Sequence, residues 1–210
     1  SYDVITPSAA RGILEAIYWK PEMKWIVDRL HVLAPIRFVD IRRNEVSEKI
    51  SARNAALAMR TGVGTLGIAV DDGKTRQQRA AHLLRDVRYG IEAHVEVNSD
   101  DGLLRKPEAK HLDQFSRRAK KGAYFHHPYL GCREFAAEFE LVDAFPPCPA
   151  ELKGRRDLGY MLQDIVFEPN ANGSIVDSNR GERLSASPRF FRAEMTNGVI
   201  EVPPLSEGRR

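Results

Sequence analysis

The sequence has few cysteines, few aromatic residues and no long apolar run, and each shortage excludes a class of protein. Its 210 residues contain only Cys132 and Cys148, with no C-x-x-C pair, which argues against a zinc ribbon, a disulfide scaffold or a redox motif. No stretch approaches the roughly 18 apolar residues of a membrane-spanning helix, and no signal-peptide pattern occurs. We therefore expect a cytoplasmic protein that does not contact a membrane.

The chain also lacks a strong excess of charge of one sign, but its positive charge is unevenly distributed. A formal net charge of +3 is too mild to imply a polyanionic partner, and 42% hydrophobic with 29% charged residues is typical of a globular protein. Between Arg105 and Lys121, however, seven Lys or Arg stand against two acidic residues, a local excess of five. Basic charge is therefore concentrated in one segment.

Near the start of the chain, the spacing of apolar residues predicts a helix. Thr6 can cap it, Pro7 suits its first position, and it must end before Pro21. Its apolar residues recur with helical spacing at Ala10, Ile13, Leu14 and Ile17. Tyr18 follows near the end, and we expect it on the flank of the apolar stripe, close to Arg11, with its hydroxyl reaching outward.

Strand patterns follow this helix. Residues 25–33 and 36–46 are rich in β-branched and aromatic residues and predict a strand or a bent strand pair. Residues 86–97 alternate apolar and polar side chains, as a half-buried strand does. Between them, near 47–80, we expect an insertion with a short helix over 47–59 and a mobile glycine-rich loop over 62–72.

A second helix is predicted from Pro107 to Gly122, with an apolar side formed by Leu112, Phe115 and Ala119. A basic stripe lies opposite, and His111 is expected on its edge. The residues of this stripe are Lys110, Gln114, Arg117, Arg118 and Lys121. A strand over residues 132–142 is expected next.

The order helix, strand, strand, helix, strand predicts an α+β fold of the ferredoxin-like β-α-β-β-α-β type, with a first strand expected ahead of Ser1. This domain would span residues 1–143. Residues 144–210 would form a small antiparallel β region with strands near 160–167, 189–195 and 199–202, a terminal hairpin turning at Asn197-Gly198, and a loose tail from Pro203. In the ferredoxin-like topology the end of the first helix approaches the start of the second, which brings Tyr18 near Lys110 and His111.

This combination of side chains suits RNA cleavage without a metal ion. The reaction needs a base for the 2′-hydroxyl, an acid for the leaving 5′-oxygen and a cation for the developing phosphorane charge, and His, Tyr and Lys can supply them. The alternative is that Lys110-His111 is simply a solvated helix edge. Residues 124–129 offer a similar choice, because their aromatic rings could stack on unpaired bases or pack as an ordinary turn.

Three segments resemble one known family. Residues 1–21, including Ser1–Val4, Thr6–Gly12 and Ile17–Pro21, closely resemble the CRISPR-associated Cas5 family in its type I-C (Dvulg) form. The segments Ile41–Glu45 and Pro128–Glu134 are similar to that family as well, in the expected order. The resemblance therefore spans nearly the whole chain.

The resemblance implies an endoribonuclease that cuts precursor CRISPR RNA within its repeats, by metal-independent attack of the 2′-hydroxyl and without a cofactor. It then keeps hold of the 5′ handle of the crRNA, with the other subunits of the type I-C surveillance complex as partners. The family's catalytic Tyr falls on Tyr18 and its Lys-His pair on Lys110-His111. A subunit that binds the handle without cutting is the alternative. Beyond the catalytic residues, we expect RNA contacts from Arg11, Arg42, Arg43, Gln114, Arg117, Arg118 and Lys121.

Overall fold

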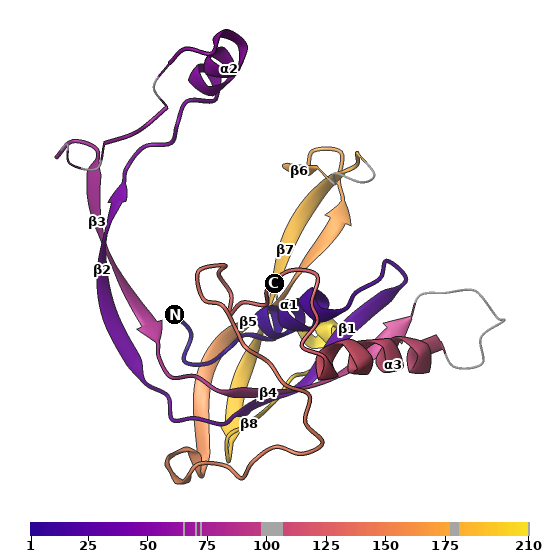
Figure 1. The fold of residues 1–210 in the computed structure, drawn as a ribbon. Helices are drawn as coiled ribbons and strands as arrows, with labels where there is room; N and C mark the ends of the chain where they lie inside the picture. Colours follow the sequence, from indigo (N-terminus) through magenta and orange to yellow (C-terminus); the bar gives the residue numbers. More distant parts are fainter. Residues whose placement is uncertain (65, 70, 72, 98–106, 177–180, 210) are drawn as a thin grey trace. The chain divides into compact units, whose positions relative to one another are not determined.

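The computed structural model describes residues 1–64, 66–69, 71, 73–97, 107–176 and 181–209 (Figure 1). It divides the chain into two compact units, one formed by Ser1 with Arg37–Arg85 and the other by Tyr2–Ile36 with Asp86–Arg210. Helices and antiparallel strands occur side by side along the chain, which confirms the α+β class. None of the helices in the described ranges combines the length and apolar character that a bilayer span requires.

Helix α1 (Pro7–Ile17) begins as predicted, with the Thr6 hydroxyl oxygen accepting a hydrogen bond from the Ala9 N–H at 3.2 Å. Its apolar stripe is buried against the large sheet. No glycine closes the helix. Instead Tyr18 turns to an extended conformation, with φ of −156°, while its N–H still donates to the Leu14 carbonyl at 2.9 Å.

The larger unit is built on a six-stranded antiparallel sheet in the order β4-β1-β8-β7-β5, with β6 paired to β7. Its strands are β1 (Met23–Val32), β4 (Tyr89–Val97), β5 (Arg155–Pro169), β6 (Ile175–Val176), β7 (Arg183–Thr196) and β8 (Val199–Glu201). Asn197 and Gly198 both have positive φ, 52° and 78°, so the predicted tight turn between β7 and β8 is confirmed. The C-terminal hairpin of β7 and β8 thus extends the sheet that β1 and β4 begin, because β8 pairs with β1.

A β-bulge explains why the first strand shows no clean alternation in the sequence. Met23, Trp25 and Val27 are buried, and the register against β4 then shifts between Val27 and Arg29. The extra residue, Asp28, changes the parity, so Leu30 and Val32 face the same core as the earlier odd-numbered residues. The core continues across the sheet through Met161, Phe191, Ala193, Met195 and Ile200.

Helix α3 (Pro107–Lys120) ends two residues before Gly122, whose φ of +63° closes the last turn, as the sequence predicts. Its buried side differs from the expected one. His111 and Ala119 are buried and Phe115 packs edge-on to Trp25 at 4.8 Å, whereas Leu112 is 40% exposed. The face that includes His111 therefore packs toward the core, so the expected place of His111 on the edge of the basic stripe is wrong, and the alternative of a solvated edge does not hold for His111 either.

The smaller unit consists of a two-stranded antiparallel ribbon, β2 (Phe38–Val46) and β3 (Arg76–Leu84), and helix α2 (Ala52–Thr61). The expected short helix is thus present, displaced by a few residues, and begins at the Ser51 cap. Strand β3 was not expected, because no face of it is buried. Strand β2 pairs with β3 and not with β1, and residues 65, 70 and 72 of the predicted loop lie outside the described residues.

The expected strand over residues 132–142 is wrong. The chain turns on itself there, since the Leu130 N–H donates to the Phe135 carbonyl at 2.8 Å and the Phe135 N–H donates to the Cys132 carbonyl at 2.9 Å. A single bridge, Tyr129 to Ala136, is the remnant of strand pairing. The tail expected to be loose also differs, because Arg209 and Phe190 exchange two backbone hydrogen bonds of 2.8 Å.

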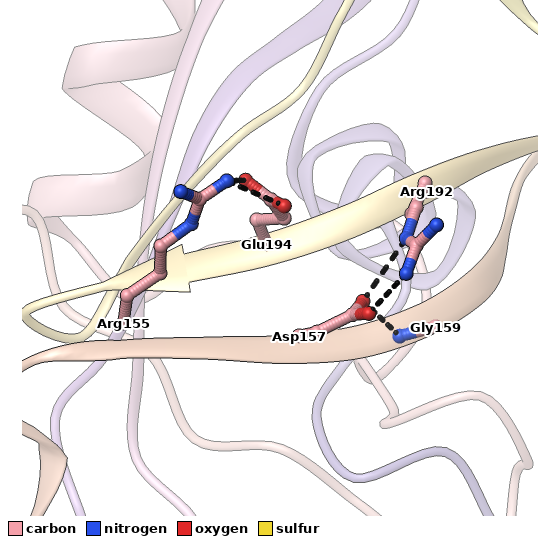
Figure 2. Close-up of polar contacts among 5 residues, drawn as sticks. All are labelled: Arg155, Asp157, Gly159, Arg192 and Glu194. Atoms are coloured by element: carbon pink, nitrogen blue, oxygen red, sulfur yellow. Dashed lines mark hydrogen bonds and ion pairs between the residues drawn. The ribbon is translucent and has the colours of Figure 1, made fainter.

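Two ion pairs cross the exposed face of β5 and β7 (Figure 2). Arg155 contacts both carboxylate oxygens of Glu194, at 2.8 and 2.6 Å, and Arg192 reaches Asp157 at 2.5 Å. A bulge after Asp157 places Gly159 at φ of +73°, from where its N–H donates to the same carboxylate at 2.9 Å. The Arg192 hydrogen bond and that N–H lower the pKa of Asp157.

Candidate active site

The end of helix α1 is held by donors from distant parts of the chain. Its last two carbonyls, those of Ala16 and Ile17, accept from the Phe125 N–H at 2.8 Å and from the Arg118 Nε at 2.7 Å, and the carbonyl of Tyr18 accepts from the Trp25 Nε1 at 2.8 Å. Such carbonyls have no partner within their own helix, and buried ones need one. The three bonds therefore fix the backbone that presents Tyr18.

The structure brings Tyr18 and His111 together across 93 positions of sequence. The Tyr18 hydroxyl lies 3.1 Å from the His111 Nδ1, a hydrogen-bond distance, and the two residues are only 5% and 4% exposed. The expectation that the Tyr18 hydroxyl reaches outward is wrong, because the residue leaves the helix in an extended conformation and points inward. Lys110, the neighbour of His111, is exposed.

Burial raises the pKa of Tyr18 above its usual value, and the carboxylate of Glu22 raises it further, against a smaller opposing effect of Arg118. The phenol therefore keeps its proton at neutral pH. Its contact with His111 is possible in two forms, since either the Tyr18 hydroxyl or the His111 Nδ1–H can donate. In the second form the Nε2 of His111 carries a free lone pair, which is what a general base needs.

The predicted basic stripe splits into two parts. Lys110, Arg117 and Lys121 are exposed, and Arg117 pairs with Asp113 at 3.3 Å and contacts Gln114. Arg118 is instead turned toward α1, where its guanidinium also lies over the Phe125 ring at 4.3 Å. The exposed residues of the stripe can contact phosphate, whereas Arg118 connects α3 to the end of α1.

The other residues predicted to bind RNA lie elsewhere. Arg11 is on α1, where it pairs with Glu15 at 3.0 Å and with Asp164 of β5 at 2.7 Å. Arg42 and Arg43 lie on β2 in the smaller unit, paired with Ala80 and Arg79 of β3. The two acidic partners of Arg11 leave its guanidinium engaged within the larger unit.

Sequence reasoning placed Phe115 on an apolar helix side and noted the ring of Phe125, but it missed the contacts by which Trp25, Phe115 and Phe125 support the site. Trp25 shows only as an apolar residue of a strand, and nothing local indicates that its indole N–H binds the Tyr18 carbonyl. Within the described part of the chain, no three His, Cys, Asp or Glu side chains gather as metal ligands would. The expectation of a reaction without a metal ion stays a prediction.

Comparison with known proteins gives a consistent result. The sequence profile of the CRISPR-associated protein family Cas5d matches residues 1–203. A protein of Mannheimia succiniciproducens named CRISPR pre-crRNA endoribonuclease Cas5d is 48% identical over 210 residues, covering 98% of this chain and 85% of the relative. A Thermus thermophilus protein of the same name is 39% identical over 207 residues, covering 97% and 81%.

Two solved structures share the fold. A functionally uncharacterized protein from Streptococcus mutans superposes with a TM-score of 0.63 at 21% identity, covering 100% of this chain and 86% of that one. A structure described as a CRISPR-associated protein superposes with a TM-score of 0.59 at 22% identity, covering 100% and 85%. At these identities the likeness concerns the fold alone.

Proposed function

The chain belongs to the CRISPR-associated Cas5 family, in its Cas5d form, and from that premise we propose that Tyr18, Lys110 and His111 cleave precursor CRISPR RNA within its repeats. It is a pre-crRNA endoribonuclease like its two curated relatives. The finer parts of this proposal are attack by the 2′-hydroxyl without a metal ion, and retention of the 5′ handle in the type I-C surveillance complex. The proposed place of action is the cytoplasm.

We also propose that the core around the site is ferredoxin-like. In its support, α1, β1, β4 and α3 occur in the helix-strand-strand-helix order of that fold when β2, α2 and β3, which stand between β1 and β4 in the chain, are treated as an insertion. Strands β1 and β4 are antiparallel neighbours. The RNA-processing function is assigned to residues 1–143 and the supporting β region to residues 144–210. This division concerns function and does not separate two structural units, since β8 pairs directly with β1 in one sheet.

The proposed chemistry starts from the protonated Tyr18. With the Nδ1–H of His111 donating to the Tyr18 oxygen, the Nε2 accepts the proton of the 2′-hydroxyl as this oxygen attacks phosphorus. Tyr18 gives its proton to the leaving 5′-oxygen and takes the Nδ1 proton in exchange. Lys110 contributes the positive charge that stabilises the phosphorane. The products are a 2′,3′-cyclic phosphate and a 5′-hydroxyl.

One observation carries these roles, the 3.1 Å contact between the Tyr18 hydroxyl and the His111 Nδ1 in a nearly buried setting. A low-dielectric surrounding strengthens each electrostatic interaction and favours proton transfer between fixed partners. The exposed Lys110 beside this pair gives phosphate a contact at the surface. Because Tyr18 and His111 are nearly buried, the RNA has to approach them at the small part of their surface that is exposed.

Incubation of a repeat RNA with the protein in excess EDTA tests the proposal. We expect cleavage at one position and products ending in a 2′,3′-cyclic phosphate, and no cleavage when the scissile nucleotide carries a 2′-deoxy sugar. Cleavage that stops in EDTA would contradict the metal-free reaction, and cleavage that continues on the 2′-deoxy RNA would contradict attack by the 2′-hydroxyl. Tight binding of the repeat RNA without any cleavage would favour the alternative, a subunit that only holds the handle.

A further inference from the structure

A large aromatic ring stands exposed beside the proposed site. Phe125 follows the end of α3 and is 63% exposed, although a phenyl ring gains free energy from burial. Single exposed apolar residues are common and need no explanation by themselves. Phe125 differs because specific contacts hold it in this position.

Two of these contacts prepare the ring for stacking. The Phe125 N–H donates to the Ala16 carbonyl at 2.8 Å, which fixes the backbone, and the Arg118 guanidinium lies 4.3 Å from the ring centroid. Arg118 is itself anchored by its bond to the Ile17 carbonyl. A ring with a cation over it and its backbone tied down loses little conformational entropy when a second flat group covers it.

The ring is also tied to the residues that present Tyr18. Phe125 binds the carbonyl two residues before Tyr18, and Arg118 binds the carbonyl one residue before it. Arg118 is close enough to influence the pKa of Tyr18. An RNA whose scissile phosphate lies at Tyr18, Lys110 and His111 therefore passes close to Phe125.

We propose that Phe125, with Arg118 over its ring, is a stacking platform for an unpaired base of the RNA next to the scissile phosphate. This inference rests on the proposed function for the position of the phosphate. Unpaired bases in RNA stack on aromatic rings and on Arg planes with little preference for base identity. The platform positions the strand for attack and has no part in the proton transfers.

The experiment uses uncleavable repeat RNA, made with a 2′-deoxy sugar at the scissile nucleotide and 2-aminopurine placed in turn at each of the neighbouring unpaired positions. Stacking quenches the fluorescence of this base analogue. We expect quenching at one position on binding to the wild-type chain, absent in Phe125→Leu and retained in Phe125→Tyr. The affinity of Phe125→Leu should fall about tenfold, the usual effect of losing one stacked base.

An abasic nucleotide at the quenched position provides the matching change on the RNA. It should weaken binding to the wild-type chain about tenfold and leave the affinity of Phe125→Leu unchanged, because both changes remove the same contact. Phe167→Leu, which removes another exposed aromatic ring, on β5, should bind like the wild-type chain.

Quenching that persists in Phe125→Leu, or affinity losses that add, would overturn the proposal. Normal RNA binding by Phe125→Leu would also overturn it. The outcome is separate from that of the proposed function. Quenching without cleavage of ordinary RNA refutes only the nuclease mechanism, and cleavage without quenching refutes only the platform.

Discussion

The Tyr18–His111 contact and the ion pairs of β5 and β7 are both polar contacts between elements distant in sequence, but they differ in burial. Tyr18 and His111 are 5% and 4% exposed, whereas the Arg192 and Asp157 side chains are 62% and 46% exposed (Figure 2). Water competes for exposed charges and salt screens them, so such pairs stabilise a fold little. A buried donor or acceptor has no such substitute partner.

The difference in burial decides which of the two contacts retains a transferable proton at neutral pH. On the β5–β7 face the ionised form of Asp157 is favoured by Arg192, so an ordinary surface carboxylate becomes still more acidic. At the end of α1, burial disfavours the ionised form of Tyr18 and keeps a transferable proton at neutral pH. The ionic contacts of β5 and β7 are therefore not expected to supply a proton at neutral pH, although they are shorter than the Tyr18–His111 contact.

The largest expected effect is that of His111→Ala. Loss of a general acid or base reduces rates by about 10²- to 10⁴-fold, and the unpaired Tyr18 hydroxyl should cost about 1–3 kcal/mol of stability. Single-turnover cleavage and urea unfolding measure the two effects. His94→Ala is the matched control, since His94 pairs with Asp28 on an exposed strand face. Equal losses in both variants would break the comparison.

Arg118→Ala should come next, with a loss of about 2 kcal/mol from an unpaired Ile17 carbonyl and the missing cation above Phe125. The reason is that the Arg118 guanidinium donates a hydrogen bond to the end of α1, where water does not replace it. Urea unfolding checks the loss, and Arg117→Ala, on the exposed side of the same helix, is the control. A stable Arg118→Ala variant would show that the end of α1 holds without it.

Alkaline pH should sharpen the comparison through two tyrosines whose pKa is raised by burial, Tyr18 in the core and the partly buried Tyr89. Burial raises the pKa of Tyr89 to about 12, and that of Tyr18 is raised for the same reason. Above about pH 10 the unfolded chain releases these protons first, so stability should be unaffected below pH 10 and fall as pH rises from about 10 to 12. Urea midpoints between pH 9 and 12 test this. Tyr89→Phe should flatten the decline, and an equal decline would exclude Tyr89 as its source.

The smallest effect belongs to Arg192→Ala. Because Arg192 and Asp157 are exposed, we expect no measurable change in cleavage and little change in the urea midpoint. The same measurements at low and high salt complete the test. A large loss of stability would mean that the β5–β7 pairs stabilise the sheet in the way that buried contacts do.

Some elements could be predicted because their signals are local. Thr6 and Pro7 start α1, and Gly122 ends α3. In the expected strand over 132–142, Ala137 is buried and Phe139 packs against the core, yet the only strand-like pairing found there among the described residues is the Tyr129–Ala136 bridge. Whether a segment forms a strand depends on the backbone that lies alongside it. Strand β3 shows the opposite case, because it has no buried face that its sequence could reveal, yet it pairs along its whole length with β2.

The sequence by itself determined that Tyr18 ends one helix and that Lys110-His111 begins another, and the resemblance to the Cas5 family assigned these residues their expected roles. Only the tertiary structure decided that the Tyr18 hydroxyl turns inward to His111, that Leu112 and not His111 is on the open side of α3, and that Arg118 holds α1. The physical reason is that helix spacing fixes angles around one axis. Burial and hydrogen-bond partners depend on how separate axes pack, and a one-dimensional pattern does not contain that information.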